Sequence, residues 1–109
     1  MRFKDVDNNI YLISRDFAIR IIKLYSYLRD EKREYIISKQ VFKSGTSIGA
    51  NAFEGSNAQS RADFSSKMNI ALKEATETLY WLDLLHTTQY INDTQFESLN
   101  NDGSRILAT

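Results

Sequence analysis

The sequence predicts an all-α protein, an antiparallel up-and-down four-helix bundle. Apolar residues recur at intervals of three and four, as they do in helices with one buried face. The 109 residues include no proline, the residue that most often breaks a helix. Four such segments are separated by short polar breaks, and short connections favour antiparallel neighbours. We expect residues 1–109 to form a single domain.

The first helix is predicted to begin at about Ser14, which would cap it, because residues 1–10 are polar and are expected to be irregular. The charge-rich sequence DEKRE, residues 30–34, is predicted to form the following turn. The apolar stripe of this helix has spacings of four, three and four: Phe17, Ile21, Leu24 and Leu28.

The second helix is predicted from about Arg33 to Gly55 and contains the unusual sequence KSGTSIGANAFEG, residues 43–55. Its small residues suggest a phosphate-binding loop, but such a loop has its glycines before a helix and a Lys-Ser/Thr pair at its end. Here KSG opens the stretch, while Val41, Ile48 and Ala52 follow helical spacing. A helix is therefore the better interpretation. Each glycine costs it about 1 kcal/mol, which indicates close packing against a neighbour.

The third helix is predicted from about Arg61 to Gln89, after a break at residues 56–59. Ser60 followed by Asp63 resembles a capping box at its start. Its apolar surface covers more than half of the circumference, so several neighbours must cover it. The fourth helix is predicted from about Thr94 to Leu107, interrupted by Gly103.

Composition excludes several classes of protein. Fourteen basic and fourteen acidic residues give zero net charge, which disfavours a general polyanion binder. The absence of cysteine excludes disulfides, thiolate zinc sites and cysteine nucleophiles, and it fits a reducing cytoplasm. No signal-peptide core and no apolar run of about 20 residues are present. We expect a cytoplasmic protein without a membrane partner.

Catalytic machinery is not evident in the sequence. A carboxylate-bridged metal bundle needs Glu-x-x-His on two helices, whereas this chain offers Glu74 and Glu77 and one histidine, His86. No serine has a visible activating base. We therefore expect no catalytic residue, no cofactor, no metal and no small-molecule substrate, and we predict that the protein is not an enzyme.

Polar residues on the predicted apolar faces form a candidate buried network. Asn51 lies within the stripe of the second helix, and Glu74 lies in the middle of an apolar arc of the third. A buried carboxylate needs a partner. Asn51, Ser44, Ser47, or one of Arg15, Arg20 and Lys67 are the candidates for Glu74. The predicted network consists of Ser44, Ser47, Asn51, Glu54, Glu74 and Glu77.

A second set of apolar residues points away from the predicted core. Phe42 and Phe53 are eleven residues apart, which is close to three helical turns, so they align. Aligned apolar residues on several helices suggest a surface for self-association. The alternative is that these residues belong to the core. The candidate oligomer interface is Phe42, Phe53, Tyr80, Ile19 and Ile22.

Basic residues suggest an alternative function, nucleic-acid binding through a surface that forms when the protein assembles. Oligomerisation can concentrate charge locally despite a neutral chain, although lysines more often form a solvated face. The candidate nucleic-acid contacts are Lys39, Lys43, Arg61, Lys67 and Lys73, with Lys32 and Arg33 as further candidates.

Residues 38–85 strongly resemble the four-helix bundle family that includes the 23S ribosomal RNA intervening-sequence proteins. The most specific sequences are KSGTSIGAN, AQSRADF and IALKEATETLYWL, and FAIRIIKLYSYL at residues 17–28 resembles the first helix of that family. The resemblance implies an antiparallel bundle that forms pentamers. It also implies a relationship to accessory proteins of diversity-generating retroelements, which are thought to bind nucleic acid and a reverse transcriptase.

The resemblance assigns a structural role to the residues that match the recurrent positions of the family. These are Ser44, Ser47, Asn51, Glu54, Arg61, Phe64, Glu74 and Trp81. The zero net charge departs from the basic character expected of RNA-binding relatives. We therefore expect a non-enzymatic homo-oligomer, a pentamer, that acts as a scaffold or adaptor for itself or another protein. The alternative is a module that binds structured RNA.

Overall fold

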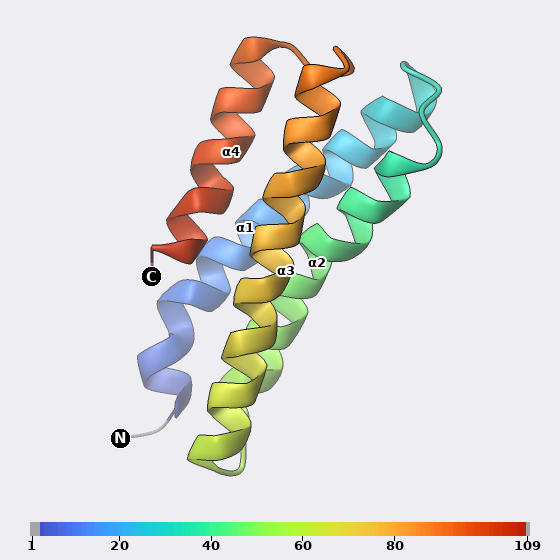
Figure 1. The fold of residues 1–109 in the computed structure, drawn as a ribbon. Coiled ribbons are helices and arrows are strands. Elements are labelled where there is room, and N and C mark those ends of the chain that lie inside the picture. The colour runs from blue at the N-terminus through green and yellow to red at the C-terminus, as the bar shows by residue number, and fades with distance from the viewer. Residues whose placement is uncertain (1–2, 109) are drawn as a thin grey trace.

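The computed structural model describes the backbone of residues 3–108 and the side chains of residues 9–108. It contains four helices: α1 (Phe3–Asp30), α2 (Ile37–Ser56), α3 (Arg61–Thr87) and α4 (Asp93–Leu107). Consecutive helices run in opposite directions (Figure 1), which confirms the predicted up-and-down four-helix bundle. With 15 residues, α4 is much shorter than α1 and α3, so it covers only part of their length.

The first helix begins earlier than the sequence analysis placed it. Residues 3–10 are helical, so their predicted irregular structure is wrong, and residues 1–2 lie outside the described part. Ile10 and Ser14 lie seven and three residues before Phe17, and both are buried on its side of the helix. Ser14 is therefore an interior residue and not a cap. The Ser14 hydroxyl has no hydrogen-bond partner in the described part of the chain.

The second helix begins at Ile37 and not at Arg33. Arg33 has a φ of 55°, in the left-handed region, so the helix cannot pass through it. The buried carboxylate of Glu34 then accepts hydrogen bonds from the backbone N–H groups of Ile36, Ile37 and Ser38, at 3.3, 3.0 and 2.6 Å. These are N–H groups that a helix start leaves without intrahelical partners.

The remaining helix ends lie close to their predicted positions. Ser60 caps α3 by accepting a hydrogen bond from the backbone N–H of Asp63, at 3.0 Å. The helix ends at Thr87 instead of Gln89, because Gln89 has a φ of 71°. Asn92 and Gln95 form a capping box at the start of α4.

Gly103 does not interrupt α4, contrary to the prediction. It is buried, and a Cβ at this position would lie 2.8 Å from Cδ2 of Leu79 and 3.4 Å from Cζ of Phe17. The glycine is thus the point at which α4 packs closely on the bundle.

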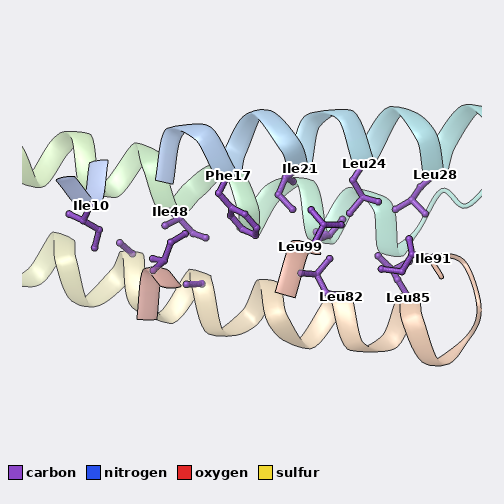
Figure 2. Close-up of a cluster of buried hydrophobic side chains, with 14 residues drawn as sticks. Ile10, Phe17, Ile21, Leu24, Leu28, Ile48, Leu82, Leu85, Ile91 and Leu99 are labelled. Atoms are coloured by element: carbon purple, nitrogen blue, oxygen red, sulfur yellow. The ribbon is translucent and has the colours of Figure 1, made fainter. Parts of the chain in front are cut away.

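The core runs along the axis of the bundle (Figure 2). Phe17, Ile21, Leu24 and Leu28 line one side of α1, as predicted, and Leu82 and Leu85 of α3 lie across from them. Val41, Ile48 and Ala52 are fully buried on α2, so KSGTSIGANAFEG is a helix within the bundle and not a phosphate loop. None of the helices that the structure describes has the length and apolar character needed to cross a membrane.

Candidate functional site

Exposed apolar side chains gather on the outer surface of α1 and α2, which we call the α1/α2 face. The predicted interface residues Ile19, Ile22, Phe42 and Phe53 lie there, each between 37% and 53% exposed. They are not core residues. Leu12 extends the set on α1, since it is also exposed and lies seven residues before Ile19 and ten before Ile22. Their role in an interface stays a prediction.

Two pairs of aromatic rings join the helices on the α1/α2 face. The ring centroids of Tyr11 and Phe53 are 5.4 Å apart, and those of Tyr25 and Phe42 are 4.9 Å apart. Neither tyrosine was among the predicted interface residues, although their separation of fourteen residues places them on one side of a helix.

A groove of about 300 Å³ lies on this face. Small residues border it: Ala18 on α1, and Gly49 and Ala50 on α2. Arg15 is the charged residue of its lining, which contains no acidic side chain in the described part of the chain. Arg15 is exposed, and its side chain contacts that of Asp16, which is also exposed, at 3.5 Å. The groove is therefore apolar, with one weakly held positive charge.

The seam between α2 and α3 contains the polar residues that the sequence singled out. The hydroxyls of Ser44 and Thr78 are hydrogen-bonded at 2.8 Å, and both residues are fully buried. Ser47 and Asn51 bond within their own helix, since Asn51 donates to the carbonyl of Ser47 at 2.9 Å. Thr78 was missed because threonine at an apolar helical position gives no separate signal.

Glu74 is partly buried beside this seam, but its carboxylate forms no hydrogen bond or ion pair with another described residue. None of the three expected cations pairs with Glu74: Lys67 pairs with Glu54 at 3.0 Å, Arg20 pairs with Asp102 at 2.6 Å, and Arg15 contacts only its neighbour Asp16 among the described residues, at 3.5 Å. Ser44, Ser47 and Asn51 do not reach the carboxylate either. The predicted six-residue network is therefore not connected through Glu74.

The electrostatic environment of Glu74 disfavours its charge. Burial raises the pKa of its carboxyl above the ordinary value, and the nearby carboxylate of Glu77 adds to this effect, while Lys43 and Lys73 oppose it. Glu77 accepts a hydrogen bond from Nε1 of Trp81, at 3.2 Å.

Three apolar residues accompany these two carboxylates on α3: Ile70 and Tyr80, which are exposed, and Trp81, which is partly buried. Ile70, Glu74, Glu77 and Trp81 follow spacings of four, three and four, so they share one side of the helix. The ring of Tyr80, 54% exposed, packs edge-on against Trp81 with centroids 5.0 Å apart. We call this surface the α3 edge and define it by these five residues.

The predicted nucleic-acid contacts do not form a patch free of acidic residues. Lys67 is paired with Glu54, which raises the pKa of the lysine, and Lys43 and Lys73 lie within electrostatic range of Glu74. Lys39 and Arg61 are exposed near the starts of α2 and α3. Nucleic-acid binding by these residues stays a prediction.

His86 lies where α3 meets α4 and has structural contacts. Its Nε2 lies 2.7 Å from Oδ1 of Asp93, and its ring stacks on Phe96 with centroids 4.2 Å apart. Within the part of the chain that the structure describes, no three His, Asp or Glu side chains come together as metal ligands.

A known structure and a known protein family match this chain. No curated protein matches this chain. A crystal structure from Bacteroides thetaiotaomicron, described as a protein with unknown function from the S23 ribosomal protein family, is 55% identical to it. The match covers 94% of this chain and 91% of that chain, with a TM-score of 0.92. Residues 6–109 match the family described as 23S rRNA-intervening sequence protein. The chain therefore belongs to the 23S rRNA-intervening sequence protein family.

Proposed function

We propose that this protein is a non-enzymatic scaffold or adaptor that acts as a homo-oligomer, with the α1/α2 face as a contact surface between copies. The observation that carries the proposal is the gathering of exposed apolar side chains on that face, including Ile22, Phe42 and Phe53. Contiguous exposed apolar surface is typical of protein–protein contact sites. A pentamer is the stoichiometry that the family resemblance implies.

The charge distribution supports self-association over binding of structured RNA. RNA phosphates need accessible cations, whose contacts make the affinity strongly salt-dependent. Here Lys67 is held by Glu54, and Lys43 and Lys73 lie near Glu74. An apolar contact surface needs no such excess of positive charge.

Light scattering at micromolar concentration tests the proposal. We expect the unmodified protein to have a mass several times that of one chain, and Ile22→Lys/Phe53→Lys to be monomeric with unchanged helical circular dichroism. Leu107→Lys is the matched control, because Leu107 is also exposed but lies on α4. It should assemble normally. A monomeric mass for the unmodified protein would overturn the proposal.

A further inference from the structure

Two different surfaces of this molecule complement each other in charge and in apolar character. We propose that successive copies bind head to tail, with the α3 edge of one copy seated on the α1/α2 face of the next, and Arg15 of the face paired with Glu74 and Glu77 of the edge. The inference rests on the proposed self-association and identifies the two surfaces that carry it. The occupant of the groove on α1/α2 is thus a second copy of this chain.

The α1/α2 face offers a cation without a strong partner. Arg15 borders the groove, contacts Asp16 at 3.5 Å and remains 56% exposed in its side chain. Lys39 lies three residues before Phe42 and is exposed on the same side of α2. A carboxylate entering this groove would meet positive charge beside aromatic rings.

The α3 edge offers carboxylates in a complementary setting. Glu74 is partly buried and lacks a hydrogen-bonding partner among the described residues, and Glu77 lies one turn away. Lys43 and Lys73 act on Glu74 through space but form no ion pair with it in that part of the chain. A planar guanidinium can bind a carboxylate through two parallel N–H···O bonds, a geometry that a lysine ammonium does not offer. Arg15 of another copy would supply this partner.

The apolar parts of the two surfaces match as well. Ile70, Tyr80 and Trp81 accompany the carboxylates of the edge, and the rings of Tyr11 and Phe53 line the groove of the face. Ile22 and Phe42 are exposed elsewhere on the same face. Burying both sets would remove water from around the charge pair and strengthen it.

The positions of the charged residues favour this head-to-tail contact over a dimer in which two α1/α2 faces bind each other. In a two-fold dimer through the α1/α2 face, the same patch occurs on both sides. Glu74 lies on α3, outside that patch, so its carboxylate would gain no partner from such a dimer. A contact between two different surfaces instead leaves one face and one edge open on every pair. Further copies can then add until a ring closes.

Mixing two variants tests the head-to-tail contact. The face variant Ile22→Lys/Phe53→Lys retains its α3 edge, and the edge variant Ile70→Lys/Tyr80→Lys retains its α1/α2 face. All four residues are exposed, so both variants should fold. We expect each variant alone to be monomeric and the mixture to give a 1:1 dimer that does not grow further.

The other outcomes overturn the inference. If the edge variant assembles alone, or if the mixture stays monomeric while the unmodified protein assembles, the head-to-tail contact is wrong but self-association stands. If the unmodified protein is itself monomeric, the proposed function fails as well.

A charge exchange tests the named residues independently. Arg15→Glu is expected to weaken assembly about tenfold or more. Arg15→Glu/Glu74→Arg in one chain should restore part of this loss, because the exchanged pair forms between copies with reversed charges while Glu77 keeps its negative charge. Circular dichroism confirms folding of each variant. Absence of restoration in folded protein would contradict the pairing of Arg15 with Glu74.

Discussion

Gly45 of α2 lies directly against Ile21 of α1, where a Cβ on the glycine would come 2.8 Å from both Cγ1 and Cγ2 of the isoleucine. Ile21 is fully buried and branched at Cβ, so it has little freedom to move aside. Gly45→Ala should therefore force the helices apart and lower the free energy of unfolding by about 1–3 kcal/mol. Urea denaturation measures this change.

Gly49→Ala is the matched control on the same helix. The added Cβ would lie 3.6 Å from the backbone of Ser14, an ordinary van der Waals distance. Because alanine is the better helix former by about 1 kcal/mol, this variant should be neutral or more stable. Equal destabilisation by both substitutions would contradict the close approach at Gly45.

Glu34 stabilises the start of α2 from outside the helix. Its carboxylate accepts three backbone N–H groups, so Glu34→Ala should cost about 1–2 kcal/mol of unfolding free energy, the range of a lost N-terminal cap. Glu34→Gln keeps one acceptor oxygen and should lose less. Thermal unfolding can compare the two variants, and an unchanged melting temperature in Glu34→Ala would show that the cap contributes nothing.

Two buried serines should respond differently to the same substitution. Ser14 and Ser44 are both fully buried, but among the described residues only Ser44 has an interhelical partner, the hydroxyl of Thr78. Ser14→Ala removes an unpaired hydroxyl and should be neutral or stabilising, whereas Ser44→Ala should cost about 1 kcal/mol. Midpoints of denaturant unfolding measure the stability of the two variants. A larger loss of stability in Ser14→Ala than in Ser44→Ala would contradict the prediction.

The apolar spacing predicted the fold because each helix buries one stripe, and Phe17, Ile21 and Leu24 are buried as expected. The helix ends were less predictable. The start of α1 was hard to predict because residues 1–10 are mostly polar, although Ile10 continues the apolar stripe of this helix. The start of α2 depends on the left-handed backbone conformation of Arg33. Arginine rarely adopts this conformation, so the residue type gives no indication of it.

The candidate site was partly predictable for a related physical reason. Outward positions follow from helical periodicity, so Phe42 and Phe53 could be predicted from the sequence. The groove could not, because it forms between two helices and depends on how the tyrosines of α1 lie against α2. The partners of charged residues depend on distances between helices. Lys67 was expected near Glu74 but lies against Glu54 instead, at 3.0 Å.

The raised pKa of Glu74 predicts a specific pH dependence of stability. Between the ordinary glutamate pKa of 4.5 and the higher folded value, the native state binds more protons than the unfolded state. The free energy of unfolding should therefore fall as pH rises through this window, because burial and Glu77 disfavour the charge while Lys43 and Lys73 compensate only partly.

Glu74→Gln removes this titration and should be more stable than its parent near neutral pH, by up to about 0.5 kcal/mol. The advantage should disappear as pH falls below 4.5, where Glu74 is protonated in both states. Both proteins should carry Ile22→Lys/Phe53→Lys, so that assembly does not supply Arg15 as a partner. Urea unfolding from about pH 4 to pH 8 measures the difference, and parallel profiles for the two proteins would show that Glu74 is not destabilised by its charge.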